Sequence, residues 1–138
     1  MASLFVYGTL MSAEIFQAVT GVAPVTRKAT LKGFRRFEVK NADYPGIIAR
    51  KDAEVEGLIC KAIPEAIWTR LDKFEGEMYQ REKVVVHLDG GETLDVFVYV
   101  VRAEYADMLG SQEWDYDNFI KSGKNNFVSQ YAGFHDLD

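Results

Sequence analysis

Residues 80–102 read QREKVVVHLDGGETLDVFVYVVR, which are two apolar segments joined by a short glycine turn. The first segment, residues 80–88, is centred on three valines, and the second, residues 94–102, is apolar at nearly every position. The connection Asp89-Gly90-Gly91 is typical of a hairpin, because glycine adopts the left-handed conformations of tight turns without steric cost. The pattern predicts two antiparallel strands that are neighbours in a sheet.

Further strands and three helices are expected on either side of this hairpin. Strands are predicted at residues 3–7, 29–39, 47–49 and 54–62, and helices at residues 12–19, 64–74 and 114–131. Strands outnumber helices and do not alternate strictly with them, which favours an α+β fold with a mixed or largely antiparallel sheet. Because several strands are apolar at consecutive positions, we expect a sheet that is covered on both faces or partly rolled into a β-barrel.

Single residues mark the ends and irregularities of these elements. Ser12 is expected to cap the first helix, and Pro64 suits the first position of the second helix. Gly46 and Gly57 indicate a bend or a bulge near the third and fourth strands. Gly123 interrupts the helical spacing of the last segment, because glycine is a poor helix former.

The composition is that of a globular protein. With 138 residues and no linker-like stretch, the chain is expected to form one domain over residues 1–138. The net charge of −5 gives no electrostatic footprint for nucleic acid, and Arg35 and Arg36 are interpreted as part of a solvated strand face. No apolar run reaches the about 18 residues that span a membrane. Since the N-terminus also lacks the basic segment of a signal peptide, we expect a cytoplasmic protein.

Cysteine and histidine give no sign of a metal or nucleophilic site. Cys60 is the single cysteine and lies in an apolar run, so it is interpreted as a small core residue rather than a nucleophile. His87 and His135 are far apart in sequence and lack partners at ligand spacing, so we expect both to be surface or structural residues.

The first candidate functional segment is the end of the first strand, Tyr7-Gly8-Thr9-Leu10. A strand that turns at glycine into a helix presents several backbone N–H groups at one place, and such a nest holds anions. Gly8 also allows a ligand to approach the backbone closely. An ordinary turn is the alternative interpretation of these residues.

The second candidate segment is residues 71–77, in which Glu75 lies four residues after Leu71 and seven after Trp68. These positions form one stripe of the predicted helix, so Glu75 falls where an apolar residue is expected. A carboxylate directed towards the interior has a raised pKa, which suits a proton shuttle. Alternatively, the helix ends at Phe74, and Glu75 faces water or pairs with Arg81.

Neighbouring residues complete the candidate site. Asp72 lies off the apolar stripe and Glu77 lies past the helix, so both are interpreted as solvated. Tyr79 and Arg81 share one face of the next strand by alternation. They either line a pocket floor near Glu75 or form a structural hydrogen bond and an ion pair.

Together these motifs resemble the γ-glutamylcyclotransferase-like family, in particular its AIG2-like branch. The matching residues are Tyr7-Gly8-Thr9-Leu10, Ala29-Thr30-Leu31-Lys32-Gly33-Phe34, Tyr44-Pro45-Gly46, Leu71-Asp72-Lys73-Phe74-Glu75-Gly76, Tyr79-Gln80-Arg81 and Trp114-Asp115-Tyr116. The resemblance covers nearly the whole chain. It implies a mixed β-barrel with flanking helices.

The resemblance also implies a reaction in which the α-amine of a small γ-glutamyl substrate attacks its own γ-carbonyl. Glu75 would be the catalytic acid and base, while Tyr7, Gly8, Thr9, Leu10, Tyr79 and Arg81 would contact the substrate. The products are 5-oxoproline and an amine or amino acid, and no metal or cofactor is required. Leu10 is followed by Met11-Ser12-Ala13-Glu14 rather than the Lys- and Gly-containing stretch of γ-glutamylamine cyclotransferases, so the substrate stays open.

Two other functions compete with the enzyme. A non-catalytic module that kept the pocket would bind a small amino-acid-like ligand without turnover. An interaction domain would use the aromatic segment 114–134, although aromatic residues at helical spacing more often belong to a core. The sequence leaves the oligomeric state open.

Overall fold

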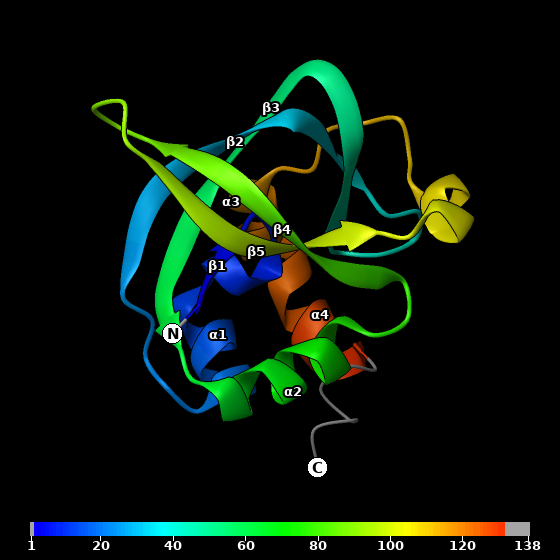
Figure 1. The fold of residues 1–138 in the computed structure, drawn as a ribbon. Helices are drawn as coiled ribbons and strands as arrows, with labels where there is room; N and C mark the ends of the chain where they lie inside the picture. Colours follow the sequence, from blue (N-terminus) through cyan, green and yellow to red (C-terminus); the bar gives the residue numbers. More distant parts are fainter. Residues whose placement is uncertain (1, 132–138) are drawn as a thin grey trace.

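Five strands of this computed structural model, which describes residues 2–131, close into a barrel in the order β1-β3-β2-β4-β5 (Figure 1). The strands are β1 (Ala2–Val6), β2 (Thr26–Glu38), β3 (Pro45–Ile63), β4 (Tyr79–Leu88) and β5 (Thr93–Val101). Neighbouring strands are antiparallel, except that β1 and β5 run parallel where the barrel closes. The predicted α+β fold with a largely antiparallel, rolled sheet is confirmed.

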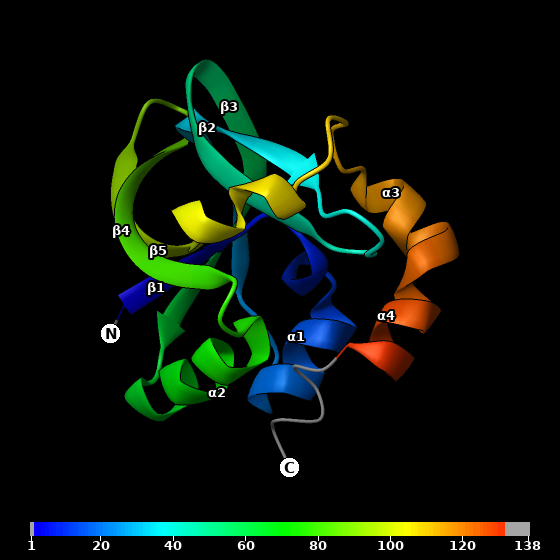
Figure 2. The same ribbon diagram turned by 90° about the vertical axis from the view of Figure 1, so that its right-hand side faces the viewer.

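The helices lie around one end and one side of the barrel (Figures 1 and 2). They are α1 (Ala13–Thr20), α2 (Glu65–Glu75), α3 (Tyr116–Asn118) and α4 (Lys124–Gln130), with 3₁₀ segments at Thr9–Met11 and Ala103–Met108. A π-helical segment, Phe119–Gly123, joins α3 to α4, so the predicted interruption at Gly123 is confirmed. None of the helices in the described chain is long and apolar enough to cross a membrane.

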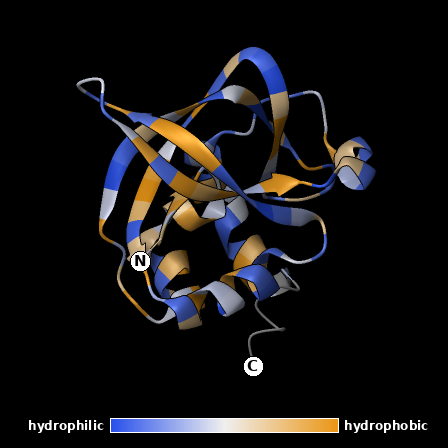
Figure 3. Cartoon of the chain, in the orientation of Figure 1, coloured by the Kyte–Doolittle hydropathy of each residue, from blue (hydrophilic) through white to orange (hydrophobic). Residues whose placement is uncertain are grey.

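The predicted antiparallel hairpin is present in the structure. β4 and β5 pair from Tyr79 opposite Val101 to His87 opposite Thr93, and both turn glycines have positive φ, 92° and 91°. Hydrophobic and hydrophilic residues alternate along the strands (Figure 3). This alternation gives the sheet one side that faces the barrel interior and one side that faces the helices or the solvent.

Strand β1 is apolar at consecutive positions because it packs against a different core on each of its two faces. Phe5, together with Tyr7 just past the end of the strand, belongs to a core whose other members are all strand residues and which is the interior of the barrel. Leu4 and Val6 belong to a second core shared with the helices. Both faces of β1 are therefore buried, and the strand ends in the space between the barrel and the helices.

The local capping was predicted more accurately than the strand boundaries. Ser12 caps α1 by accepting a hydrogen bond from the Ile15 N–H (3.3 Å). Pro64 occupies the N-cap of α2 rather than its first helical position. The predicted strands 47–49 and 54–62 are parts of one long strand, β3, which stays paired with β2 around the barrel wall.

The bulge in this part of the sheet was predicted at the wrong residues. The register shifts between Lys32 and Phe34, at Gly33, whose φ is 86°. Gly46 and Gly57 instead allow close packing. A Cβ at Gly46 would overlap the Val101 side chain, and a Cβ at Gly57 would overlap the carbonyl oxygen of Val6 in β1. These glycines mark contacts between layers rather than changes of register.

Candidate active site

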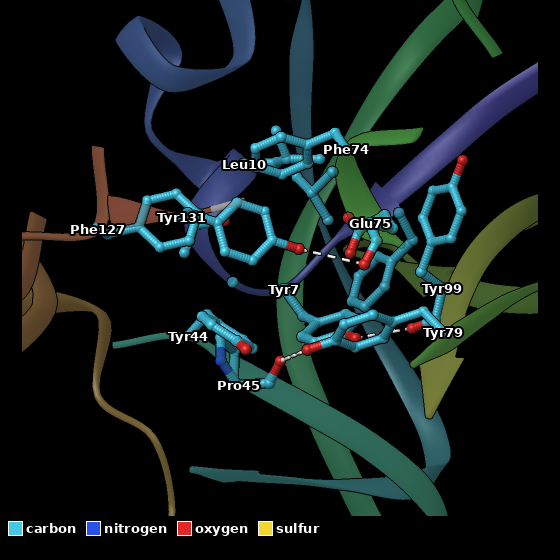
Figure 4. A pocket seen from close by; sticks show the side chains of 14 residues that line it. Tyr7, Leu10, Tyr44, Pro45, Phe74, Glu75, Tyr79, Tyr99, Phe127 and Tyr131 are labelled. Atoms are coloured by element: carbon cyan, nitrogen blue, oxygen red, sulfur yellow. Dashed lines mark hydrogen bonds between the residues drawn. The ribbon is translucent and has the colours of Figure 1, made fainter. Parts of the chain in front are cut away.

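A narrow pocket opens where β1 runs into the first 3₁₀ segment and where α2 ends (Figure 4). Its cavity volume is about 30 Å³, and the space between its walls is about 420 Å³ when the part open to solvent is included. Its walls contain the predicted residues Tyr7, Gly8, Thr9, Leu10, Glu75 and Tyr79, together with Tyr44, Pro45, Phe74, Tyr99, Phe127 and Tyr131. The structure therefore brings together all the predicted site residues except Arg81.

Glu75 is the last residue of α2, and its side chain enters the pocket. Trp68 and Leu71 on the same helix are buried, as the apolar stripe predicted. Figure 4 shows the carboxylate among the rings of Tyr7, Tyr99 and Tyr131. The alternative, in which the helix ends at Phe74 and Glu75 turns to water, is wrong.

The surroundings of Glu75 raise the pKa of its carboxyl to about 8. The larger cause is burial, because the rings around the carboxylate replace the water that would solvate its charge. The smaller cause is the negative charge of Asp72 on the same helix. A carboxyl with this pKa both accepts and donates a proton near neutral pH.

The turn formed by residues 7–10, here called the 7–10 turn, is the backbone wall of the pocket. The Met11 N–H donates to the Gly8 carbonyl (3.0 Å) and the Ser12 N–H donates to the Thr9 carbonyl (3.1 Å). The N–H groups of Gly8, Thr9 and Leu10 make no hydrogen bond within the described chain, as expected for the first turn of a helix. These free donors suit an anion or a developing oxyanion.

Two tyrosines line the pocket while their hydroxyls donate hydrogen bonds to backbone carbonyls of the barrel strands. The Tyr7 hydroxyl donates to the Tyr99 carbonyl (2.7 Å), and the Tyr79 hydroxyl donates to the Pro45 carbonyl (2.6 Å). Burial raises the pKa of Tyr7 and the pKa of Tyr79 well above their usual value, and the nearby Glu75 charge raises both further. Both phenols therefore stay neutral, and both interpretations of Tyr79 hold, since it lines the pocket and makes a structural hydrogen bond.

Arg81 does not line the pocket and pairs with Asp72 rather than Glu75, which fits its structural interpretation, while its contact with substrate stays a prediction. Its guanidinium lies over the rings of Trp68 (4.8 Å) and Phe97 (5.4 Å) and pairs with Asp72 (3.7 Å). Alternation does place Arg81 on the face of Tyr79, but two residues along the strand carry it past the end of the pocket.

Asp72 is exposed to solvent, as predicted, but it also belongs to the surroundings of Glu75. It accepts a hydrogen bond from the Tyr99 hydroxyl (2.7 Å) and affects the Glu75 carboxyl through its charge. Tyr99 could have been identified as a neighbour of the site from the sequence, because the hairpin pairs it with Arg81. Glu77 is exposed, as predicted.

Aromatic residues from distant segments form the rim of the pocket. The ring of Tyr44 lies 5.1 Å from that of Tyr131 and 6.0 Å from that of Phe127. The Tyr131 hydroxyl donates to the Glu75 carbonyl (3.1 Å) and so joins the end of α4 to the end of α2. Helical spacing identified Phe127 and Tyr131 as core residues, but no local pattern connects them to Glu75.

Arg36 was also misread as a solvated residue. Its guanidinium donates to the Tyr7 carbonyl (2.7 Å) and to Glu113 (3.1 Å) and lies over the Trp114 ring (5.5 Å). The side chain is 14% exposed. No local sequence pattern predicts these contacts, because Glu113 lies 77 residues further along the chain.

The remaining candidate residues have structural positions. Cys60 is buried in the core, and burial raises the pKa of its thiol to about 12. Within residues 2–131, no group of three or more metal-ligating side chains comes together. Trp114 and Phe119 are buried in the helix-side core, as expected for the aromatic segment. His135 and Phe134 lie outside the described residues.

The chain is similar in sequence and in fold to known proteins. AIG2-like protein D of Arabidopsis thaliana is 33% identical over 137 residues, which cover 97% of this chain and 89% of the relative. The solution structure of another Arabidopsis thaliana protein superposes with a TM-score of 0.72 at 28% identity, over 93% of this chain and 86% of that one. A solved γ-glutamyl cyclotransferase has a TM-score of 0.68 at 17% identity, over 99% and 85% of the two chains, which shows the fold alone.

The family assignment rests on sequence. Residues 4–116 match the family model described as γ-glutamyl cyclotransferase, AIG2-like. This range includes the 7–10 turn, Glu75 and the Trp114 segment, so the resemblance of the ordered motifs is confirmed. The chain belongs to the AIG2-like γ-glutamyl cyclotransferase family.

Proposed function

We propose that this protein is a γ-glutamyl cyclotransferase that converts a small γ-glutamyl compound to 5-oxoproline and a released amine or amino acid. The observation that carries the proposal is the Glu75 carboxyl, which has a pKa of about 8 and shares its pocket with the 7–10 turn. Acid–base groups work best when their pKa lies near the working pH. A pocket that only bound an amino acid would have little use for such a group.

Glu75 carries the proton traffic in this proposal. In its ionised form it accepts a proton from the substrate α-ammonium, and the freed nitrogen attacks the γ-carbonyl carbon to form the ring C–N bond. Glu75 then returns the proton to the leaving nitrogen as the original C–N bond breaks. The second proton lost by the α-nitrogen passes to the released amine, which departs as an ammonium, and Glu75 is again a carboxylate.

The pocket supports this reaction in two ways. Holding the amine against the carbonyl of the same molecule removes much of the entropic barrier, worth about 7–11 kcal/mol in well-oriented intramolecular reactions. The free N–H groups of Gly8, Thr9 and Leu10 stabilise the substrate carboxylate or the oxyanion formed on attack. Because the described space is narrow, the rim rings of Tyr44 and Tyr131 must separate when the substrate binds.

The test is a panel of γ-glutamyl amino acids, γ-glutamylamines and glutathione, with release of 5-oxoproline as the readout. Wild type is compared with Glu75→Gln, which keeps the shape of the side chain, and with Glu77→Gln, a matched change at an exposed position. We expect turnover by wild type and Glu77→Gln and its loss in Glu75→Gln. Equal activity of Glu75→Gln and wild type contradicts the mechanism.

The same panel separates the enzyme from the binding module. A module that only binds would be thermally stabilised by some γ-glutamyl compounds, by roughly 2.7 kcal/mol at about 100 times the Kd, and would release no 5-oxoproline. Stabilisation without turnover across the panel therefore rejects the enzyme.

A further inference from the structure

Arg36 connects the 7–10 turn, which lines the pocket, to residues 113 and 114, which follow the last strand of the barrel. It lies on β2 opposite Ile47, and its side chain is largely buried although it carries a full charge. A buried charge is costly unless it is paired and hydrogen-bonded. Glu113 and Trp114 provide part of this compensation, and Nη1 of Arg36 donates a hydrogen bond to the Tyr7 carbonyl.

The bond to the Tyr7 carbonyl fixes the orientation of the peptide between Tyr7 and Gly8. No cis peptide bond occurs in the described chain, so the Tyr7 C=O and the Gly8 N–H lie in one plane and point in opposite directions. Arg36 is absent from the pocket walls, whereas Tyr7 and Gly8 both line the pocket. The carbonyl is therefore drawn away from the pocket, and the Gly8 N–H is turned towards it.

The charge of Arg36 adds to this geometric effect. Hydrogen bonds in series polarise one another, so a cation on the carbonyl oxygen makes the N–H of the same peptide a stronger donor. Arginine suits the task because its planar guanidinium stays charged, stacks on the Trp114 ring and donates to Tyr7 and Glu113 at once. Lysine keeps the charge but cannot make all three contacts.

We propose that Arg36 is a positioning residue that orients and polarises the Tyr7–Gly8 peptide, so that the Gly8 N–H serves as an anion donor in the pocket. The use of this donor in turnover rests on the proposed cyclotransferase function. The orientation of the peptide does not, and it can be measured in the free protein.

The experiment combines nuclear magnetic resonance with kinetics. The ¹⁵N shift of the Gly8 amide responds to hydrogen bonding at the preceding carbonyl, and it is recorded without substrate for wild type, Arg36→Gln, Arg36→Lys and Arg35→Gln. Arg35 is the matched control, because it is exposed and lies over the Phe37 ring away from Tyr7. We expect the largest change in Arg36→Gln, a smaller one in Arg36→Lys and none in Arg35→Gln.

Kinetics on the substrate found in the γ-glutamyl panel completes the test. Arg36→Gln should lower kcat roughly 10- to 100-fold and change KM less than about threefold, with partial rescue in Arg36→Lys. A purely structural role would lower stability and leave kcat per folded molecule unchanged. An unmoved Gly8 amide, or wild-type kcat in Arg36→Gln, overturns the proposal; if Arg36→Gln does not fold, Arg36→Lys is judged by the same two measurements.

The cyclotransferase function and the positioning role of Arg36 would fail in different measurements. If wild type releases no 5-oxoproline from any compound, the cyclotransferase assignment fails, and the Gly8 shift alone decides whether Arg36 orients the peptide. If wild type is active and the Gly8 shift is insensitive to Arg36, only the positioning role is lost.

Discussion

The Tyr99 hydroxyl donates a hydrogen bond to the Asp72 carboxylate at 2.7 Å and so holds this charge one helical turn from the catalytic candidate. Nη1 of Arg81 lies 3.7 Å from the same oxygen. Asp72 thus occupies a fixed position, from which its negative charge opposes ionisation of Glu75. Residues outside the pocket thereby adjust the protonation of the residue within it.

The pH dependence of turnover should report this arrangement. The carboxyl of Glu75 must be ionised to accept the first proton, so we expect kcat/KM to rise with pH through a midpoint near its pKa of about 8. Asp72→Asn removes the like charge and keeps an acceptor for Tyr99, so the midpoint should move to lower pH. The shift should be partial, because burial is the larger cause. Full pH profiles test this, and a midpoint that stays in place or rises in Asp72→Asn contradicts it.

The free energy of unfolding should also depend on pH through the raised pKa of Glu75, even in the absence of substrate. Between the usual pKa of 4.5 and the folded-state pKa of about 8, folded Glu75 keeps a proton that the unfolded chain releases. Rising pH therefore destabilises wild type through this group, by up to about 1.4 kcal/mol per pH unit, and the partial exposure of Glu75 reduces this limit.

The matching variant is Glu75→Gln, which does not titrate. Urea unfolding at pH 5, 6.5 and 8 should show the variant gaining stability relative to wild type as pH rises. Titration of every other group cancels in this difference. A difference that is the same at all three values would show that the pKa of Glu75 is not raised.

Gly8 should tolerate no side chain, because a Cβ there would lie 2.7 Å from the Cγ of Pro45. Overpacking of this kind costs about 1–3 kcal/mol, and here it would also displace the 7–10 turn. Gly8→Ala should lower the melting temperature and abolish 5-oxoproline release. The control is Gly110→Ala, whose Cβ would meet its nearest atom at an ordinary 3.5 Å. Wild-type turnover in Gly8→Ala would exclude a close backbone role for this residue.

The thiol of Cys60 should be inert in the folded protein. The residue is 1% exposed, and burial raises the pKa of its thiol to about 12, so thiolate is scarce at neutral pH. A chromogenic disulfide reagent should label no thiol under native conditions and one thiol per chain in urea. Rapid labelling of the native protein would mean that the core opens locally around β3.

Local patterns predicted what neighbours in sequence determine. The hairpin, the caps and the inward direction of Glu75 all follow from spacings of a few residues, and the structure contains each of them. The stripe through Trp68 and Leu71 placed the carboxylate in the interior before any fold was known. The ordered motifs then connected it to the 7–10 turn, which no periodicity relates to α2.

Contacts between distant segments escaped prediction. Arg36 was read as solvated because a basic residue on an alternating strand normally faces water, and only the fold brings the Tyr7 carbonyl and Trp114 to it. The contacts of Arg81 with Asp72 and Trp68 were not predicted either, since alternation indicates which face of a strand a residue lies on but not what packs against that face. The rim rings of Tyr44 and Tyr131 meet only in the folded chain.

The parallel pairing of β1 with β5 has a consequence for how the molecule is made. Leu4 of β1 pairs with Phe97 of β5, so this pairing joins segments that are far apart in the sequence. Closing so long a loop costs conformational entropy that is recovered only when the strands meet, which makes this a late event in folding. The 7–10 turn continues directly from β1, and a nascent or partly folded chain therefore has no assembled pocket. The chemistry proposed for Glu75 therefore requires the closed barrel.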